Sequence, residues 1–313
     1  MPAGDLENSS LPRSQKRAKI PFFKVAVCAA CVVFAALWGI AGFIGWQLTH
    51  PQRRSVDMTP AALGLKYENI SFVSKTDHII LKGWMVTAPE NRRTVIIAHG
   101  YGRNRLQDDV PLLPVIASLV KNGSNAVLFD FRNSGESGGH ITSIGLFEVL
   151  DLLGAIDFVR SHPEWNQQIV LYGFSMGAST ALVAASLDPS VAAVIADSPF
   201  ADLEGYLREN LSVWTNLPAV PFNTMILSIT PLLTGLDISH MSPLASIQSY
   251  GSRPVLLIHG EADSDIPINN SEQLLEKHRH AQLFRVPGAV HVGSFRQNQD
   301  RYLEEVNRFL EKL

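Results

Sequence analysis

The sequence predicts an α/β fold in which helices flank a mostly parallel central sheet, preceded by one transmembrane helix. Three observations lead to this prediction. Short, almost wholly apolar stretches alternate with helical ones along most of the chain, as expected of strands buried on both faces. Residues 173–177 place a serine between two glycines, where one such stretch gives way to a helix. Residues 25–49 are apolar and long enough to cross a bilayer.

The N-terminal apolar stretch predicts an uncleaved membrane anchor. Residues 25–49 contain no Asp, Glu, Lys, Arg or His, and as a helix they would extend roughly 38 Å. A signal peptide has a shorter apolar core, of about 7–15 residues, followed by a small-residue cleavage site. Residues 47–51, Gln-Leu-Thr-His-Pro, are not such a site. A cleaved signal peptide and a buried soluble helix are the alternatives.

The charges on the two sides of the predicted span indicate its orientation. Basic residues are more frequent before it than after it, and basic flanks stay in the cytoplasm. We therefore expect a single-pass protein of the cell membrane, with residues 1–24 as a disordered cytoplasmic tail. Residues 50–65 would tether an extracytoplasmic catalytic domain, residues 66–313. The basic residues are Arg13, Lys16, Arg17, Lys19 and Lys24 before the span, and Arg53 and Arg54 after it.

The composition fits one globular domain of ordinary size and gives no sign of a nucleic-acid partner. The chain has 313 residues, 46% of them hydrophobic, and a formal net charge of -3. Both cysteines, Cys28 and Cys31, lie in the apolar stretch. The rest of the chain thus offers neither a disulfide nor a thiolate ligand, and we expect no cofactor and no metal. The oligomeric state is not predicted.

Apolar periodicity predicts the elements of the catalytic domain. An antiparallel pair of strands opens it, and alternating strands and helices follow. Prolines and scattered large apolar residues interrupt this alternation at about 200–241, which predicts a small helical cap between two strands. The predicted strands are 70–73, 79–86, 95–99, 125–130, 168–173, 191–197, 254–259 and 282–286, and the helices are 110–121, 146–161, 175–186, 271–278 and 295–313.

Residues 173–177, Gly-Phe-Ser-Met-Gly, have the pattern of a nucleophile elbow between a strand and a helix. A serine on so tight a turn has a strained backbone, and small neighbours let the strand and the helix pack closely. The helix N-terminus also directs N–H groups and positive dipole toward developing negative charge. The pattern therefore makes Ser175 the predicted nucleophile.

A serine nucleophile needs a base and a carboxylate that orients the base. After this type of turn they follow in the order serine, acid, histidine. Asp263, just beyond strand 254–259, is the predicted acid, and His291, just beyond strand 282–286, is the predicted base. The alternatives for the acid are Glu261, Asp265 and Asp197. The alternatives for the base are His278 and His280, which are expected on a solvated helix end. His240, in the cap, is expected to be structural.

Two backbone N–H groups are predicted to hold an oxyanion. One belongs to Met176, which follows the nucleophile. The other belongs to Tyr101, in the His-Gly-Tyr-Gly-Arg segment 99–103 after a buried strand. Gly100 and Gly102 would let this backbone approach the reacting centre closely. The alternative is a plain turn, with His99 as a structural hydrogen-bonding residue.

Residues 130–139 follow another strand and contain three glycines, but they lack the order of a phosphate-binding loop. A structural loop is predicted there.

These segments resemble the α/β-hydrolase superfamily, near its serine aminopeptidase, prolyl-oligopeptidase-like and esterase groups. The resemblance covers about residues 66–313 and leaves out the span and the tether. It implies the α/β-hydrolase fold, with Ser175 as nucleophile, Asp263 as acid and His291 as base. The matching segments are 99–102, 130–137, 173–177, 196–199, 259–263 and His291.

Three functions follow as hypotheses. The first is a membrane-anchored serine hydrolase that cleaves an ester or amide through an acyl-enzyme. Esterase or lipase-like activity is preferred, because the cap is rich in Leu, Phe and Trp and a tether suits lipid-derived substrates. The second is a serine peptidase of the aminopeptidase or prolyl-oligopeptidase-like type. The third, a non-catalytic binding protein on a hydrolase scaffold, is disfavoured by the intact serine, acid and histidine set. A small-molecule ester or peptide is the expected partner.

Overall fold

The computed structural model describes residues 22–165 and 167–313, and the chain divides between Ile40 and Ala41 into two units. The predicted tail, residues 1–24, lies outside the described residues except for its last three positions. The apolar stretch forms helix α1, Phe22–Thr49. Its last nine residues, 41–49, belong to the larger unit together with the rest of the chain.

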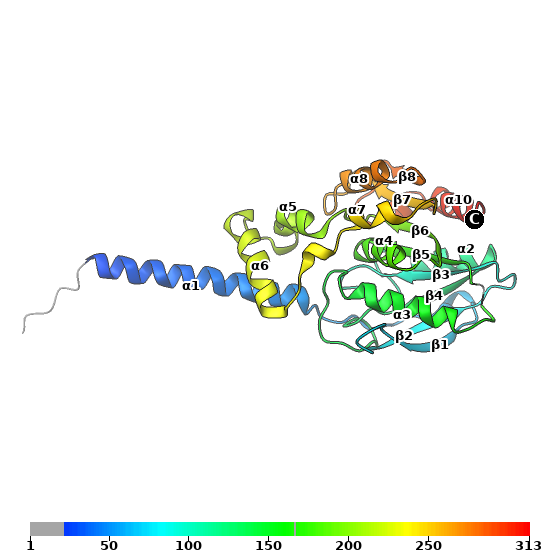
Figure 1. Cartoon of the computed structure of the whole chain (residues 1–313), viewed down its shortest axis with the longest axis horizontal. Helices are drawn as coiled ribbons and strands as arrows, with labels where there is room; N and C mark the ends of the chain where they lie inside the picture. Colours follow the sequence, from blue (N-terminus) through cyan, green and yellow to red (C-terminus); the bar gives the residue numbers. More distant parts are fainter. Residues whose placement is uncertain (1–21, 166) are drawn as a thin grey trace, which may run out of the picture. The chain divides into compact units, whose positions relative to one another are not determined.

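An eight-stranded sheet is the centre of the larger unit, with the order β1-β2-β4-β3-β5-β6-β7-β8 (Figure 1). The pairs β1–β2 and β2–β4 are antiparallel and the other pairs are parallel. This confirms the predicted mostly parallel sheet with an antiparallel edge. The strands are β1 Glu68–Val73, β2 Ile80–Val86, β3 Arg93–Ala98, β4 Ser124–Phe129, β5 Ile169–Phe174, β6 Val191–Asp197, β7 Val255–Gly260 and β8 Ala281–Val286.

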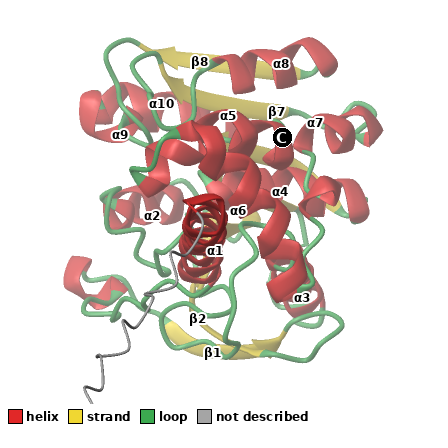
Figure 2. Cartoon of the chain, turned by 90° about the vertical axis from the view of Figure 1, so that its left-hand side faces the viewer, coloured by secondary structure: helices red, strands yellow, loops and turns green. Residues whose placement is uncertain are grey.

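Helices cover both faces of the sheet, because strands β3 to β7 are apolar on both sides and bury almost every side chain. Figure 2 shows α2, α9 and α10 on one side of the sheet and α3, α4, α7 and α8 on the other. The bounds are α2 Leu112–Lys121, α3 Glu148–Arg160, α4 Met176–Leu187, α7 Pro243–Ser246, α8 Asn269–Lys277, α9 Ser294–Gln297 and α10 Gln299–Leu310, with short 3-10 turns at Pro60–Leu63, Ile238–His240 and Ile247–Ser249.

A pair of helices, α5 Leu203–Thr215 and α6 Ala219–Thr234, forms the cap between β6 and β7. The two are bent by 114° at their junction, where Pro218 and Pro221 interrupt the helical hydrogen bonding. They lie at one end of the sheet (Figure 1). The cap falls within the predicted range, residues 200–241.

The C-terminal segment differs from its prediction. One helix was expected over 295–313, whereas the chain forms two, α9 and α10, separated at Asn298. Asn298 has an extended backbone with φ -157°, and its side chain accepts a hydrogen bond from the Arg301 N–H. An asparagine that caps a helix start in this way ends the preceding helix. The single amphipathic helix predicted there is therefore wrong at this residue.

Candidate active site

The turn between β5 and α4 places Ser175 in a strained backbone conformation. Its φ and ψ are 52° and -119°, a region that non-glycine residues rarely occupy. A Cβ at Gly173 would lie 2.2 Å from the Gly177 carbonyl oxygen, and a Cβ at Gly177 would lie 2.1 Å from the Ala98 carbonyl oxygen. Both glycines are therefore required by the close approach of backbone to backbone. This sharp turn leaves the Ser175 side chain at the end of the parallel strands.

The structure brings together the three residues predicted as nucleophile, base and acid. The His291 Nε2 lies 2.8 Å from the Ser175 Oγ, and the His291 Nδ1 lies 2.8 Å from the Asp263 Oδ2. Asp263 follows β7 and His291 follows β8, so parallel strand ends place both side chains beside the elbow. These bonds assign the tautomer: Nδ1–H donates to Asp263, and Nε2 accepts from the Ser175 hydroxyl.

Burial and hydrogen bonding shift the pKa values of the acid and the base in opposite directions. Burial would raise the pKa of Asp263, but hydrogen bonds from His259 and His291 outweigh it and lower this pKa to about 2. Burial would likewise lower the pKa of His291, but the hydrogen bond and charge of Asp263 outweigh it and raise this pKa above 6.5. Asp263 is thus ionised at neutral pH, and its charge favours the protonated imidazole.

His259 is a member of this site that the sequence did not identify. It is fully buried at the end of β7, and its Nε2 lies 3.3 Å from the Asp263 Oδ2 and 2.8 Å from the Ile266 carbonyl oxygen. The Ser271 hydroxyl lies 2.7 Å from its Nδ1. The His259 Nε2–H therefore donates to the Ile266 carbonyl oxygen, and the ring lies beside the Asp263 carboxylate. The only signal was its position at the start of the segment 259–263.

The alternative acids lie outside this hydrogen-bonded chain. Among the described residues, none of the hydrogen bonds of His291 involves Asp197, Glu261 or Asp265. Asp197 accepts instead from the Tyr302 and Ser198 hydroxyls, and burial raises its pKa to about 6.

The alternative bases also lie elsewhere. His278 is buried, and its Nε2 bonds to the Arg253 carbonyl oxygen. The expectation of a solvated helix end is therefore wrong for His278, which packs against Tyr250. His280 lies beside Arg279, and His240 is exposed and pairs with Asp237.

The segment 99–103 lies beside the elbow. A Cβ at Gly100 would lie 3.5 Å from the Phe174 carbonyl oxygen, and the Gly100 N–H donates to the Gln107 Oε1 at 2.6 Å. Within residues 22–165 and 167–313, neither the Tyr101 N–H nor the Met176 N–H donates a hydrogen bond. Both residues line the same cavity as Ser175. Two N–H groups with no hydrogen-bond partner in the described part of the chain thus belong to residues that line the cavity at Ser175.

Neighbouring loops hold this segment in place. His99 is buried, its Nε2 accepts from the Phe131 N–H, and burial lowers its pKa. The buried Asp130 carboxylate accepts from the Arg105 guanidinium and from the Glu136 N–H. Residues 130–139 are thus organised around an internal carboxylate, which agrees with the structural loop predicted there.

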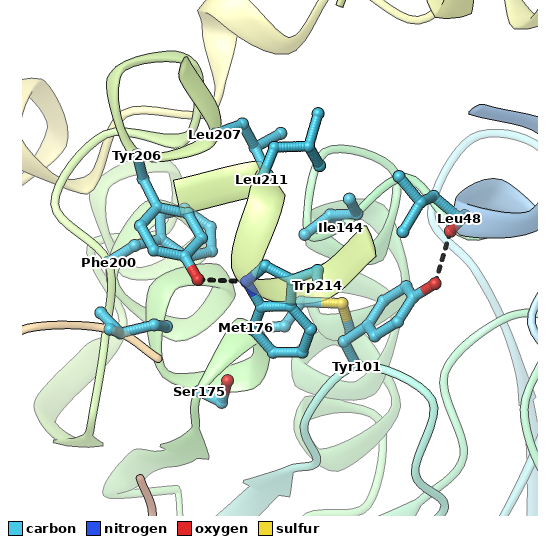
Figure 3. A pocket seen from close by; sticks show the side chains of 11 residues that line it. Leu48, Tyr101, Ile144, Ser175, Met176, Phe200, Tyr206, Leu207, Leu211 and Trp214 are labelled. Atoms are coloured by element: carbon cyan, nitrogen blue, oxygen red, sulfur yellow. Dashed lines mark hydrogen bonds between the residues drawn. The ribbon is translucent and has the colours of Figure 1, made fainter. Parts of the chain in front are cut away.

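An apolar cavity opens over the serine (Figure 3). None of the described residues that line it is Asp, Glu, Lys, Arg or His. Across the cavity, the Trp214 indole N–H donates to the Tyr206 hydroxyl (Figure 3). The described residues contain no group of three His, Cys, Asp or Glu side chains arranged to hold a metal. The lining side chains include Tyr101, Met176, Phe200, Tyr206, Leu211 and Trp214.

Comparison with known proteins agrees with this architecture. A family model described as X-Pro dipeptidyl-peptidase (S15 family) matches residues 77–227. The Bacillus subtilis protein YqkD is 31% identical over 257 residues, which cover 79% of this chain and 83% of YqkD. YfhR of Escherichia coli K12 is 31% identical over 253 residues, 78% of this chain and 80% of YfhR. The chain is an α/β hydrolase and belongs to the same family as YqkD and YfhR.

The fold of this α/β hydrolase is similar to that of a solved esterase structure. The Pyrococcus furiosus esterase Pf2001 superposes with a TM-score of 0.70 at 27% identity, over 85% of this chain and 98% of the esterase. The α/β hydrolase is therefore a serine hydrolase, as the sequence predicted.

Proposed function

We propose that this chain is a membrane-anchored serine esterase that cleaves a carboxylic ester through an acyl-enzyme on Ser175. The observation that carries the proposal is the continuous hydrogen-bonded chain from the Ser175 hydroxyl through His291 to Asp263, with both bonds 2.8 Å long. This geometry is that of a nucleophile, a general base and an orienting acid.

In the first step, His291 Nε2 takes the hydroxyl proton as Ser175 Oγ attacks the ester carbonyl carbon. The carbonyl oxygen becomes an oxyanion between the Tyr101 and Met176 N–H groups. When it collapses, the bond to the alkoxy group breaks, and the leaving alcohol takes its proton from His291. Asp263 stabilises the transient imidazolium and stays ionised throughout.

In the second step, His291 takes a proton from water as the water oxygen attacks the acyl carbon. The acid leaves as the Ser175 oxygen recovers the proton from His291. The chain supplies every group in this cycle, because each step moves only a proton or an acyl group.

An ester suits the cavity better than a peptide with a free N-terminus. A peptide's ammonium group is bound most strongly by a carboxylate. The described residues that line the cavity carry no carboxylate, whereas many of them are aliphatic. The resemblance of the fold to the esterase Pf2001 supports the same choice.

Helix α1 is the proposed anchor. The most apolar 18-residue window of Phe23–Thr49 has a mean hydropathy of 2.4, and only 6% of it is buried, as expected of a helix that faces lipid. Its last residues are joined to the catalytic unit, since the Tyr101 hydroxyl donates to the Leu48 carbonyl and the Thr142 N–H to the Thr49 carbonyl. Cleavage after α1 would remove these bonds, which favours an uncleaved anchor over a signal peptide. The flanking charges support a catalytic domain outside the cytoplasm.

The test of the proposed function is labelling of the full-length protein by a fluorophosphonate, with turnover of p-nitrophenyl esters. Wild type should be labelled, and Ser175→Ala should lose labelling and about 10⁶-fold in kcat. Ser179→Ala, a buried serine one turn into α4, is the matched control and should keep the label. A folded but unlabelled wild-type protein would refute an assembled triad. Reporters fused at the C-terminus test the topology, and activity only on the cytoplasmic side would contradict it.

A further inference from the structure

We propose that the substrate is a lipid ester with a long apolar acyl chain, and that the last turn of α1 forms part of the site that holds this chain. The proposal rests on the proposed esterase function and names its substrate class. The observation behind it is a pair of adjoining apolar cavities, of which the first contains Ser175 and both are lined by Leu48.

The two cavities share a wall. The first lies over Ser175, and the second lies between α5, α6 and the end of α1. An acyl group bound to Ser175 begins in the first cavity, and a long chain leaves it across the shared wall. The wall consists of four aliphatic residues, Leu48, Ile144, Leu207 and Leu211.

The acyl chain can pass between the cavities because the shared wall is aliphatic, and a change of side-chain rotamer opens such a wall without breaking a polar contact. The second cavity is lined mainly by Ile226, Leu227, Pro231, Leu236 and Ile238, beyond the shared residues. The apolar lining of the second cavity takes part in no step of the chemistry at Ser175. It is the surface that a long acyl chain would bury.

The end of α1 is fixed to both loops of this site. The Tyr101 hydroxyl lies 2.7 Å from the Leu48 carbonyl oxygen (Figure 3), and the Thr142 N–H lies 2.9 Å from the Thr49 carbonyl oxygen. Gly45 packs against Thr230 of α6, where a Cβ would lie 2.4 Å from the threonine hydroxyl oxygen. Leu48 is thus held in the wall by the segment that carries the oxyanion donor and by the cap.

Ile144 is presented to both cavities by a loop built around a buried carboxylate. Its φ is 55°, which is strained for a β-branched residue. The Glu148 carboxylate, fully buried, accepts hydrogen bonds from the Thr142 and Ser143 hydroxyls and from the Ser143 and Gly145 N–H groups. Four donors on one carboxylate hold the loop against this strain. The position of Ile144 in the wall is therefore specified by the fold.

Exposed apolar side chains on α6 and α1 point to a bilayer as the source of the ester. Large apolar side chains of α6 are exposed, with Val220 at 86% and Leu232 at 84%. On the last turns of α1, Phe43 and Trp46 are also exposed. Phe43 and Trp46 belong to the apolar stretch of the proposed anchor, and exposed apolar surface of this kind marks contact with lipid or with a partner. An ester of a membrane lipid would reach the cavities without leaving an apolar environment.

The experiment is a chain-length series on the full-length protein in phosphatidylcholine vesicles, with p-nitrophenyl acetate, butyrate, octanoate and palmitate. We expect kcat/KM to rise about tenfold or more from acetate to the two long esters, since each buried methylene adds binding energy. A series that is flat or that peaks at acetate would overturn the proposal.

Two variants test the two halves of the site. Leu227→Trp fills the second cavity, which Leu227 lines without reaching the first, and should lower kcat/KM for palmitate about tenfold more than for acetate. Leu232→Trp, on the exposed side of the same helix, is its matched control. Leu48→Ala removes part of the wall and should lower the palmitate-to-acetate ratio several-fold, whereas Gln47→Ala, the exposed neighbour in the same turn, should not.

The labelling experiment separates this proposal from the esterase function. Wild type that is labelled by fluorophosphonate and turns over short esters, but shows no chain-length effect in either variant, keeps the esterase function and refutes the acyl-chain site. Wild type that is not labelled refutes both. If Leu227→Trp fails to fold, unchanged ratios in Leu48→Ala are sufficient to overturn the proposal.

Discussion

The catalytic end of the sheet and the two cavities proposed to hold the acyl chain are built by different contacts. At the catalytic end, backbone packs on backbone: Gly177 leaves no room for a Cβ beside the Ala98 carbonyl. Around the two cavities, side chains make the contacts: the Thr230 side chain packs on the Gly45 backbone, and the Leu48 side chain lies against the cap. The first region therefore tolerates almost no change in its glycines, whereas the second can vary in volume and so in substrate preference.

The two regions also differ in their charges. Asp263, His259, His291 and Asp197 form a buried set of ionisable groups around the strand ends. Among the described residues that line the cavities, no side chain ionises near neutral pH, because burial raises the pKa of Tyr101 and of Tyr206 further above the ordinary value. Charge substitutions and pH should therefore affect the rate of the chemistry, and volume substitutions should affect the choice of chain length.

Among the changes that distinguish the two regions, Asp263→Asn has the largest expected effect. It should lower kcat about 10⁴-fold, because an amide favours the wrong tautomer of His291 and cannot stabilise the imidazolium. The ratio of kcat/KM for octanoate to that for acetate should stay at the wild-type value. Steady-state kinetics on both esters measure this. Asp265→Asn, at a carboxylate outside the triad, is the control, and an equal loss there would contradict the assignment of the acid.

A pair of glycine substitutions compares the two kinds of packing directly. Gly177→Ala should lower the free energy of unfolding by about 3 kcal/mol, because the new methyl group meets a backbone oxygen that cannot move. Gly45→Ala should lower it by only about 1 kcal/mol, because the Thr230 hydroxyl can turn away at the cost of its hydrogen bond to the Ile226 carbonyl, while alanine favours the helix. Thermal unfolding of wild type and both variants, all in one detergent, gives both values. Equal losses would mean that the end of α1 is packed as rigidly as the elbow.

The pH dependence should follow His291. The base must be neutral to accept the Ser175 proton, and the pKa of His291 is raised above 6.5. As the pH falls through that pKa, kcat/KM should therefore decrease, by about tenfold for each further pH unit. Asp263→Asn removes the negative charge that raises this pKa, so its apparent pKa should be lower than that of wild type. A profile that is flat between pH 5 and about 8 would exclude His291 as the base, and the chain-length ratio should not change with pH.

The smallest expected effect is that of Tyr101→Phe, which links the two regions. It removes the hydrogen bond of 2.7 Å from the Tyr101 hydroxyl to the Leu48 carbonyl, worth about 1 kcal/mol. We expect kcat to fall about fivefold with little change in KM for acetate, because the oxyanion donor loses a positioning contact. A change confined to KM would show that the hydroxyl serves substrate binding alone.

Much of the catalytic end could be predicted because local patterns report it. Gly173, Ser175 and Gly177 occur at the fixed spacing that the turn requires, and Asp263 and His291 follow apolar strands in the order of the superfamily. His259 was not predicted as a partner of Asp263, because a histidine at the end of a strand has many structural uses. The break at Asn298 was missed because apolar periodicity continues across it.

The sequence by itself determined the alternation of strands and helices, the sharp turn that carries Ser175 and the apolar N-terminal helix, because each depends on residues close together in the chain. Only the tertiary structure decided that residues 41–49 belong with the catalytic unit and that Leu48, Ile144 and Leu211 share one wall. These residues come from three segments far apart in the sequence. Their juxtaposition follows from side-chain packing across the fold, and no local spacing or periodicity encodes it.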